Sequence, residues 1–446
     1  MSVLSYLEKL LNGVDIQWKT IGEVTLRTSN IKWREATRSY RYVDLTSVDI
    51  ETKKITETTE VTANNAPSRA QKLIEENDVI FATTRPTQQR FCLIDGEYSD
   101  EVASTGFCVL RAKQDEVLPK WIWHWISTSY FKKYVEENQS GSAYPAISDA
   151  KVKECYIPVP CPENPEKSLA IQSEIVRILD KFTALTAELT AELTAELTAR
   201  KKQYNYYRDQ LLSFDEEQEK HIYLEKLLDG VEVEWKTLGE VAKYVRGLIY
   251  SKSSESADGQ GYKVLRANNI TLSNNCLNLN DVKVVRFDTK VKSSQKLYKN
   301  DILISAASGS REHVGKVAYI ESDIDYYFGG FMGVVRCDEK LNPRYLFHVL
   351  TSDIFQKYLD EMLNSSTINN LNSAVMGRFK IPLPCPDTPE KSLAIQSEIV
   401  RILDKFDTLT NSITEGLPRE IELRQKQYEY YRDLLFSFPK PDSVTN

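Results

Sequence analysis

A long internal repeat constrains the fold of this chain more than any other feature of its sequence. The segment EKSLAIQSEIVRILDKF occupies residues 166–182 and returns unchanged at residues 390–406. RKKQYNYYRDQLLSF, at residues 200–214, returns as RQKQYEYYRDLLFSF at residues 424–438, with the same offset of 224 residues. Self-similarity at a fixed offset indicates that one structural unit is used more than once. The chain of 446 residues is therefore expected to contain two copies of one plan.

Each copy opens with a similar leading segment and continues through a region where the copies differ. YLEKLLNGVDIQWKTIGEV begins at Tyr6, and YLEKLLDGVEVEWKTLGEV begins at Tyr223. The regions after them, residues 25–156 and 242–380, share only scattered matches such as His124 with His348. These matches predict a common fold. Unchanged helices around divergent regions are typical of recognition modules, and we favour that interpretation over duplication with simple drift.

Two long helices follow the variable regions. Asn164-Pro165 and Thr388-Pro389 each place a capping side chain before a proline at the first helical position. Between the repeated blocks the first copy reads TALTAELTAELTAELTA, without Gly or Pro, which predicts one continuous helix from about Pro165 to about Phe214. The second copy has Gly416 and Pro418 in the same interval, and we expect a break there.

Helices of this length need a partner that covers their apolar stripes. We therefore expect the two to form an antiparallel, coiled-coil-like pair that holds the variable regions apart. The TAEL repeat has two interpretations. It is either a solvated low-complexity helix, or a helix whose length is itself functional. We favour the second, because the corresponding interval, 17 residues from Asp407 to Leu423, has the same length in the other copy.

The variable regions are expected to be mixed α and β domains. Short β-branched runs such as NDILISAAS (from Asn300) and GKVAYIE (from Gly315) alternate with Gly, Asn and Ser clusters. A short aromatic helix closes each module, and its first copy contains Trp121, Trp123 and Trp125, which we expect in the core. The fold class is thus α/β (α+β), with an internal pseudo-twofold repeat. The expected segments are 1–156 and 223–380 for the modules and 157–222 and 381–446 for the helical spacers.

Sites for catalysis or metal binding are not indicated by the sequence. Gly309 to Val317 comes nearest to a phosphate loop, but it has five residues between its glycines where four are needed. The seven Cys form no CxxC pair and the four His no HxxxH pair, which argues against zinc and for a reducing cytosol. Apolar runs are too short for a membrane span. Residues 242–380 hold 19 basic and 14 acidic residues, so this module is moderately basic although the chain has a net charge of −7.

These features together resemble the specificity subunit of type I restriction–modification systems, in the branch with a TAEL repeat in its central spacer. The duplicated helix, the TAEL run and the IPVPCP and IPLPCP segments at Ile157 and Ile381 carry the resemblance. It implies two target-recognition domains, each reading one half of a bipartite, asymmetric DNA site. It also implies a non-catalytic, cytoplasmic subunit without its own cofactor. Two modification subunits would bring S-adenosylmethionine, and two restriction subunits would bring ATP and Mg²⁺.

Loops that align between the two copies are the candidate DNA contacts. Arg bonds guanine and Asn or Gln bonds adenine through paired hydrogen bonds in the major groove. The candidates in the first module are Arg34, Arg38, Arg41, Asp44, Thr84, Arg85, Thr87, Gln88, Gln89, Arg90, Ser104, Ser142 and Tyr144. Those in the second are Arg266, Asn268, Asn269, Ser308, Ser310, Arg311, His313, Lys316, Phe331, Ser366, Asn369 and Asn370. The alternative is a non-catalytic scaffold that joins two domains binding other ligands or proteins.

Overall fold

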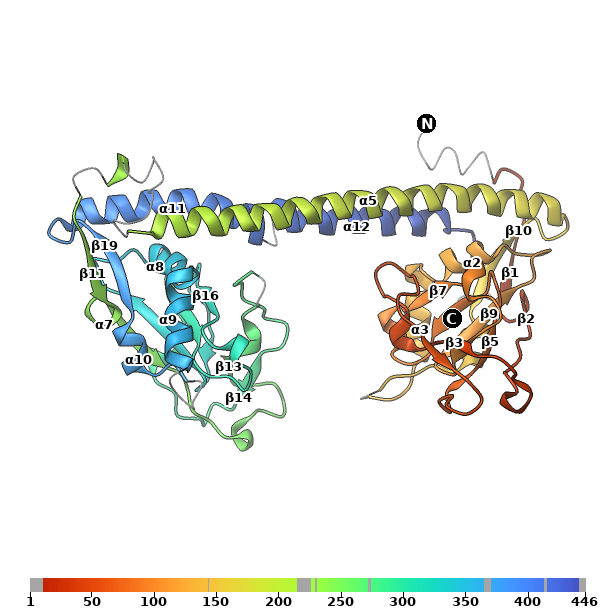
Figure 1. The fold of residues 1–446 in the computed structure, drawn as a ribbon, viewed down its shortest axis with the longest axis horizontal. Coiled ribbons are helices and arrows are strands. Elements are labelled where there is room, and N and C mark those ends of the chain that lie inside the picture. The colour runs from red at the N-terminus through yellow and green to blue at the C-terminus, as the bar shows by residue number, and fades with distance from the viewer. Residues whose placement is uncertain are drawn as a thin grey trace. The chain divides into compact units, whose positions relative to one another are not determined.

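The chain folds into two compact units, and each unit draws on both repeated helical regions. The computed structural model describes residues 11–142, 144–214, 226–228, 231–271, 274–364, 370–412 and 415–440. Unit 1 comprises Met1–Thr190 and Leu423–Asn446, and unit 2 comprises Ala191–Glu422. Figure 1 shows the ribbon coloured by residue number. Each unit thus consists of one variable module, the first part of the helical region that follows it, and the last part of the other helical region.

The module of unit 1 contains two four-stranded sheets and one two-stranded ribbon. The sheet orders are β2-β9-β6-β7, β4-β3-β8-β5 and β1-β10. Strands β3 and β8 are parallel, and the other pairs are antiparallel. The strands are β1 (Ile16–Thr20), β2 (Thr25–Leu26), β3 (Tyr40–Val43), β4 (Thr59–Val61), β5 (Ala70–Ile74), β6 (Val79–Ala82), β7 (Phe91–Leu93), β8 (Glu101–Ser104), β9 (Phe107–Ala112) and β10 (Tyr156–Pro160). The helices are α2 (Pro119–Trp125), α3 (Ser129–Asn138), α4 (Asp149–Glu154) and the start of α5 (Pro165–Leu212).

The module of unit 2 repeats this plan with small changes. Its sheet orders are β12-β18-β15-β16, β14-β13-β17 and β11-β19, and the parallel pair is β13 with β17. The strands are β11 (Val233–Thr237), β12 (Ala242–Arg246), β13 (Tyr262–Leu265), β14 (Lys283–Val285), β15 (Ile302–Ser305), β16 (Val317–Tyr319), β17 (Tyr327–Phe328), β18 (Met332–Cys337) and β19 (Lys380–Pro384). The helices are α7 (Leu238–Val241), α8 (Pro343–Leu350), α9 (Asp353–Asn364), α10 (Ser373–Arg378), α11 (Pro389–Asn411) and the start of α12 (Gly416–Leu435). The expectation that the modules share a mixed fold is confirmed.

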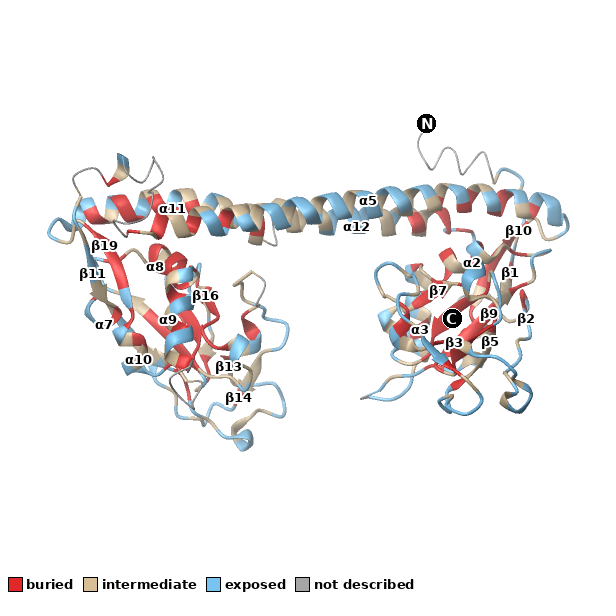
Figure 2. Ribbon diagram, viewed as in Figure 1, coloured by how far each residue is buried: buried red, intermediate tan, exposed pale blue. Residues whose placement is uncertain are grey.

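A central strand separates two cores in each module. In β6, Val79 and Phe81 enter the core beneath α2 and α5, whereas Ile80 and Ala82 enter the core between the sheets. Successive side chains of a strand point to opposite faces, so a strand covered on both sides reads as an unbroken apolar run. In β15 all four residues are buried as well, with Ile302 and Ile304 in one core and Leu303 in the other. Figure 2 shows the buried residues of both modules in red.

The long helices confirm the main predictions and correct one. α5 is continuous from Pro165 to Leu212, and the second helical region is broken between Asn411 and Gly416, whose φ of +78° suits glycine. The Asn164 side chain accepts a hydrogen bond from the Lys167 amide at 3.0 Å. The expected cap at Thr388 is wrong, because its side chain makes no capping hydrogen bond.

The helices run antiparallel within each unit. In unit 1, Phe182 of α5 stacks on Tyr431 of α12 at 5.8 Å, and the hydroxyls of Thr183 and Tyr428 lie 2.9 Å apart. In unit 2, Tyr207 of α5 packs on Phe406 of α11 at 5.6 Å. None of the helices in the described residues is long and apolar enough to cross a membrane.

The aromatic segment that closes each module differs from the prediction. It forms two helices rather than one, α2 with α3 and α8 with α9. The first helix ends at Trp125, and the Thr128 hydroxyl caps the second helix by accepting from the Phe131 amide. Trp121 and Trp125 are buried as expected, whereas Trp123 is half-buried and packs on Phe91 at 5.7 Å.

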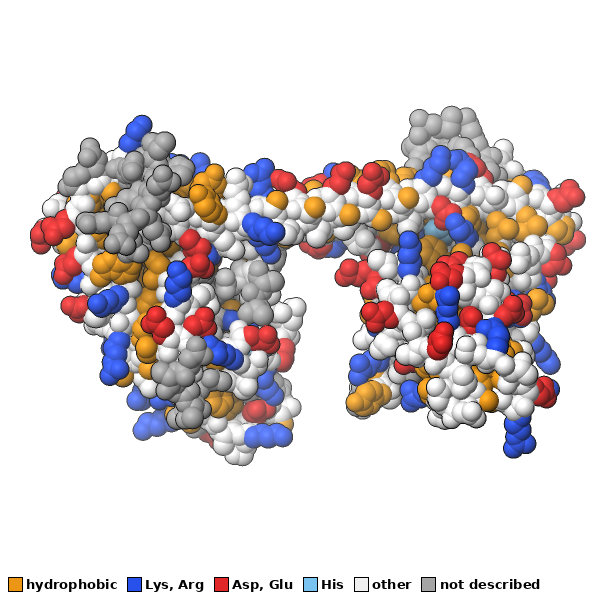
Figure 3. All heavy atoms as spheres, in the orientation of Figure 1, with side chains coloured by type: hydrophobic (Ala, Val, Ile, Leu, Met, Phe, Trp, Pro, Cys, Tyr) orange, Lys and Arg blue, Asp and Glu red, His pale blue; other side chains and the backbone are white. Residues whose placement is uncertain are grey.

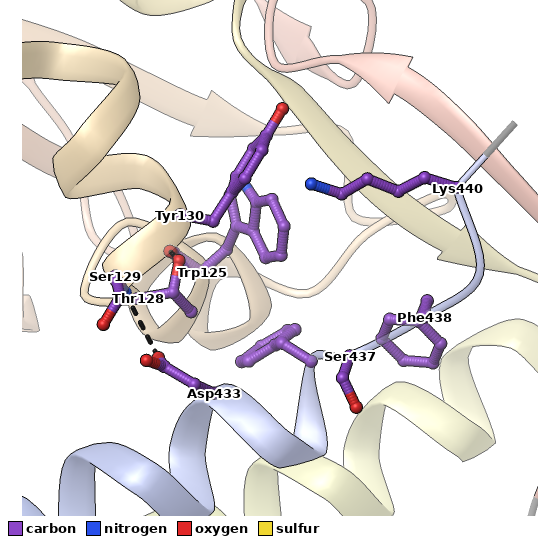
Figure 4. Close-up of a pocket in the computed structure, with 9 residues that line it drawn as sticks. Trp125, Thr128, Ser129, Tyr130, Asp433, Ser437, Phe438 and Lys440 are labelled. Atoms are coloured by element: carbon purple, nitrogen blue, oxygen red, sulfur yellow. Dashed lines mark hydrogen bonds between the residues drawn. The ribbon is translucent and has the colours of Figure 1, made fainter. Parts of the chain in front are cut away.

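The C-terminal tail closes unit 1. Phe436 packs on Trp121 at 4.7 Å and on Trp125 at 5.4 Å, and the indole of Trp18 donates to the Pro439 carbonyl at 2.8 Å. Figure 4 shows Lys440 extended toward Tyr130, with its ammonium 3.3 Å from the ring centroid. The tail therefore links α12 to the first strand of the module.

Candidate nucleic-acid interface

Loops from distant parts of the sequence meet at one edge of the first module. The Thr83 amide donates to the Gly106 carbonyl at 2.8 Å, and the Ile147 amide donates to the Thr83 carbonyl at 2.9 Å. The Arg85 amide donates to the Pro145 carbonyl at 2.7 Å. These bonds join residues 83–90, 103–106 and 140–147, which contain the predicted contacts Thr84, Ser104 and Tyr144.

The equivalent loops of the second module meet in the same pattern. The Ala306 amide donates to the Phe331 carbonyl at 2.9 Å, and the Leu371 amide donates to the Ala306 carbonyl at 2.7 Å. Ala307 bridges to Asn370, as Thr84 bridges to Ala146 in the first module. The structure therefore brings together, in each module, the loops that were paired by sequence alignment. We refer to these groups as the loop cluster of each module.

The predicted contacts differ in exposure within these clusters. Exposed candidates are Arg34, Arg38, Arg85, Gln88, Ser142, Tyr144, Asn268, Arg311 and Phe331. Half-buried candidates are Arg41, Asp44, Thr84, Thr87, Gln89, Arg90, Arg266, Ser308, Ser310, His313 and Asn370. Ser104, Asn269 and Lys316 are buried, and Ser366 and Asn369 lie outside the described residues. Exposure therefore favours the first group for direct contact with a ligand.

Aromatic and basic side chains stand out at the tips of the clusters. Tyr144 is 70% exposed and lies beside the Arg85 guanidinium, 5.1 Å from its ring centroid. Phe331 is 74% exposed in the other module. Ile249, which sequence reasoning missed, is 83% exposed on the neighbouring segment. Only its place in the short apolar run GLIY could have indicated it.

Several predicted cations already have acidic partners in the chain. Arg41 bonds Glu97 at 2.6 Å, and the Glu97 carboxylate raises the pKa of the Arg41 guanidinium. Arg38 pairs with Glu101 at 3.2 Å, and Arg311 pairs with Asp360 at 3.0 Å. The pairs of Arg41 and Arg311 are exposed, and such pairs are weak and exchange readily for phosphate contacts, whereas the Glu101 carboxylate is buried. Figure 3 shows this mixture of basic and acidic side chains on the visible face of both modules.

A lysine that the sequence did not single out supports the loop 83–90. The Lys53 ammonium donates to the Gln89 carbonyl and lies 4.4 Å from the Phe91 ring centroid. Burial lowers the pKa of Lys53 to about 8, although Asp49 opposes this. Gln89 has a positive φ of 52°, and the hydrogen bond to its carbonyl helps to hold that conformation.

Two cavities lie away from these clusters. A cavity of about 400 Å³ is lined by Trp125, Tyr130, Phe436 and Lys440 at the tail (Figure 4), and none of its lining residues is a predicted DNA contact. In the described residues no group of three or more His, Cys, Asp or Glu side chains could hold a metal ion. The seven cysteines are free thiols, of which Cys92, Cys108 and Cys155 are buried.

Comparisons with known proteins agree with the two-module architecture. A family model described as the type I restriction modification DNA specificity domain matches residues 15–199 and again residues 230–423. The EcoR124I/EcoR124II specificity subunit of Escherichia coli is 38% identical and aligned over 100% of both chains. The EcoprrI specificity subunit of Escherichia coli is 32% identical over 93% of each chain.

A solved structure supports the fold. It concerns complex assembly and conformational transition of the type I restriction–modification system, and one of its chains matches with a TM-score of 0.65 and 21% identity. The match covers 94% of this chain and 97% of that one. The relatives are named specificity subunits, which agrees with the prediction of a non-catalytic, DNA-recognising chain. The two matches to the family model and the full-length relatives show that this chain belongs to the family of type I restriction–modification DNA specificity subunits.

Proposed function

We propose that this chain reads a bipartite, asymmetric DNA site, with one half read by each module. The observation that carries the proposal is the equivalence of the loop clusters: the same backbone contacts hold loops whose side chains differ. Loops that share a backbone arrangement but carry different side chains suit the recognition of two different half-sites. We assign one recognition domain to residues 1–156 and the other to residues 223–380.

Exchange of one module tests this division of labour. The chain, assembled with its modification subunits, is expected to methylate a bipartite motif that long-read sequencing of cellular DNA reveals. Replacing residues 242–380 with the module of another family member should change one half-site and leave the other unchanged. A replacement that altered both halves would contradict independent reading.

We propose the exposed members of the predicted set as the direct contacts. Arg85, Gln88 and Asn268 offer paired donors or acceptors to base edges, and Arg34 has no ion-pair partner among the described residues. Tyr144 and Phe331 offer apolar surface to bases. Removing a phosphate contact should lower affinity for all sequences alike, whereas removing a base contact should relax specificity at one position.

The TAEL segment is proposed to set the gap between the half-sites. Deleting Thr190–Leu193 shortens the helix by ~6 Å and changes its rotation by ~400°, a net ~40°. One base pair turns B-DNA by ~34–36° and advances ~3.4 Å. Rotation should dominate, because a misrotated reader points out of the groove, whereas a length mismatch can be absorbed by bending. We expect the preferred gap to shorten by one base pair.

Methylation of DNAs that differ only in gap length tests this role of the helix. A control variant with Thr190→Ala keeps the helix length and should keep the wild-type gap. An unshifted optimum in the deletion variant would reduce the repeat to a passive linker. A shift of two base pairs would mean that rise rather than rotation governs the spacing.

The outer faces of the long helices are proposed to dock the partner subunits. Arg177 and Arg401 occupy equivalent positions, with side chains 52% and 54% exposed. Two modification subunits carrying S-adenosylmethionine would dock on these faces. Two restriction subunits using ATP and Mg²⁺ would complete the complex in the cytoplasm, where free thiols persist. Arg177→Glu and Arg401→Glu together should weaken assembly without unfolding the chain; intact assembly would contradict this docking face.

A further inference from the structure

A buried or half-buried cation reaches the same turn in both modules. In the first, the Arg90 guanidinium donates to the Leu45 carbonyl at 2.7 Å and also to the Val48 carbonyl. In the second, the Lys316 ammonium donates to the Ala267 carbonyl at 3.1 Å and to the Ile270 carbonyl at 2.9 Å. Each cation directly precedes an edge strand, β7 or β16, and each bonds the first residue of a short 3-10 turn and the residue that follows it.

A second set of contacts fixes the same turns from the other side. The Asp44 amide donates to the Ser47 hydroxyl at 3.1 Å, and the Arg266 amide donates to the Asn269 carboxamide oxygen at 2.8 Å. The Asn269 amide group also donates to the Asn278 carbonyl at 2.8 Å. Both ends of each turn are thus held. Within the turns Leu45–Ser47 and Ala267–Asn269, only the middle residue is exposed: Thr46 in one and Asn268 in the other.

The turns lie next to the loop cluster in each module. They follow β3 and β13, which are parallel to β8 and β17, so the loops that follow both strands emerge at one edge. A Cβ atom added to Gly106 would meet the Leu45 side chain at 3.1 Å. In the second module the Gly329 amide donates to the Leu265 carbonyl at 2.9 Å, next to the turn. Thr46 and Asn268 therefore project from the edge that carries the other candidate readers.

We propose that Thr46 and Asn268 are equivalent base-reading positions, and that Arg90 and Lys316 are positioning residues that hold them rather than phosphate contacts. This inference rests on the proposed function and deepens it. An Asn carboxamide pairs with adenine through its N6 and N7 atoms, whereas a Thr side chain offers one hydroxyl and a methyl group. The same turn, carrying a different side chain in each module, would recognise a different base at the corresponding position of each half-site.

The bonding of the cations explains why they are unsuited to bind phosphate. Lys316 is only 9% exposed, and two backbone carbonyls already accept from its ammonium. Burial lowers the pKa of Lys316, although the Glu312 carboxylate opposes this. An ammonium that is removed from water must keep its hydrogen bonds. Reaching a phosphate would break the contacts that define the turn.

Substitutions at Asn268 test the reader, with the chain assembled with its modification subunits. The wild-type complex is first mapped for methylated motifs. Asn268→Asp should shift the preference at one base pair of one half-site from adenine to cytosine by tenfold or more, because a carboxylate accepts from the cytosine N4 amino group. Thr46→Ala should lower the base specificity at one position of the other half-site only. An unchanged motif in both variants would overturn this inference, whereas a wild-type complex without any bipartite motif would overturn the proposed function instead.

Substitutions at Lys316 separate positioning from phosphate binding. Lys316→Met should lower the base specificity about tenfold at the position that Asn268→Asp affects, and it should leave the salt dependence of binding unchanged. The conservative variant Lys316→Arg should keep the wild-type specificity. Lys290→Met, a change at an exposed lysine of the same module, is the matched control and should keep the motif. A salt slope reduced by about one contact with an unchanged motif would show that Lys316 binds phosphate, and would overturn the positioning role. The melting temperature of each variant shows that the chain remains folded.

Discussion

The two units share their buried contacts but differ in their exposed residues. In unit 1 the buried Asp78 carboxylate binds the Arg111 guanidinium through two bonds of 2.8 Å. In unit 2, Asp301 and Arg336 repeat this pair at 2.8 and 2.9 Å. Both pairs lie in strands or loops whose neighbouring residues differ between the copies. Residues that satisfy buried charge have therefore been retained, whereas the exposed residues of the loop clusters have diverged.

The junction of module and helix shows how closely the frames agree and where they differ. His124 bonds Asp180 of α5 at 2.8 Å, and His348 bonds Asp404 of α11 at the same distance. In unit 2 the Tyr204 hydroxyl lies 3.1 Å from the second ring nitrogen of His348. In unit 1 the second nitrogen of His124 has no partner among the described residues. The corresponding tyrosine, Tyr428, instead bonds the Thr183 hydroxyl.

This difference accompanies a change of residue on the helix. Thr183 supplies a hydroxyl to Tyr428 in unit 1, whereas the corresponding residue of unit 2 is Asp407, which bonds Arg344 at 3.0 Å. With Asp407 engaged, Tyr204 is available to His348. The cation differs as well, since Lys120 bonds Asp180 in unit 1 and Arg344 bonds both Asp404 and Asp407 in unit 2. Equivalent side chains can therefore be bonded differently when their neighbours change.

Burying a charge beneath the helices should have the largest effect on both units. Ile175 and Ile399 are completely buried at equivalent positions. Ile175→Asp and Ile399→Asp should each lower the free energy of unfolding by about 4 kcal/mol or more, because an unpaired carboxylate would lose its water. Urea unfolding followed by circular dichroism measures this. Ser substitutions at the exposed Arg177 and Arg401 are the controls, and a tolerated Asp at only one site would break the equivalence of the frames.

Removing one partner of the buried ion pairs should have the next largest effect. Arg111→Met leaves the carboxylate of Asp78 buried without its cation, and Arg336→Met does the same to Asp301. Each should cost about 3–5 kcal/mol. Arg286→Met, which breaks an exposed pair with Asp288, should cost less than about 1 kcal/mol. Equal losses at Arg111 and Arg336 would support a retained frame, and a neutral result at either would contradict it.

The helices of this frame could be predicted from sequence, but most contacts of the loops could not. Pro165, the uninterrupted TAEL run and Gly416 are local signals, and they located α5 and the break after α11 correctly. The parallel pairing of β3 with β8 joins short strands about 60 residues apart, and local patterns do not encode such pairing.

Residue type alone also could not separate readers from supports in the loops. Arg90 and Lys316 were predicted as DNA contacts because they are basic residues in aligned loops. Their carbonyl partners lie about 45 residues earlier in the chain, so only the fold shows that both cations hold a turn. For the same reason Ser104 and Asn269, which the structure buries, were predicted as DNA contacts.

Acid should weaken the junctions of both units through the buried histidines. Burial lowers the pKa of His124 and of His348, although Asp180 and Asp404 oppose it. Unfolded histidine, with a pKa near 6.5, then binds more protons than the folded residue. Stability is therefore fully present above about pH 6.5 and is lost as pH falls below it, by up to about 1.4 kcal/mol per pH unit for each residue. This window is distinct from that of the carboxylates, which lies below about pH 4.

Unfolding measured between pH 8 and pH 5 checks the acid effect. His124→Gln and His348→Gln should each remove part of the slope, even if they lower the stability at neutral pH. Burial raises the pKa of Asp404, but the hydrogen bonds from His348 and Arg344 lower it further than burial raises it, so Asp404 stays charged throughout this range. A slope that persisted in the double variant would show that other groups govern acid sensitivity.

The tyrosines should show the smallest effect and the sharpest difference between the units. The Asp404 carboxylate can only accept, so the His348 nitrogen that faces it carries the proton. The other nitrogen of the neutral ring then accepts from the Tyr204 hydroxyl. Tyr204→Phe leaves that buried acceptor without a partner and should cost about 1–2 kcal/mol. Tyr428→Phe should cost only about 0.5 kcal/mol, because the Thr183 hydroxyl keeps its bond to the Leu179 carbonyl at 2.8 Å.

Denaturant midpoints of the Tyr204→Phe and Tyr428→Phe variants measure this contrast, and Asp407→Thr in unit 2 sharpens it. With a hydroxyl offered at that position, Tyr204 should turn to it as Tyr428 does, and Tyr204→Phe should then cost no more than Tyr428→Phe. An undiminished cost in that background would mean that the neighbour at position 407 does not decide how the tyrosine is bonded.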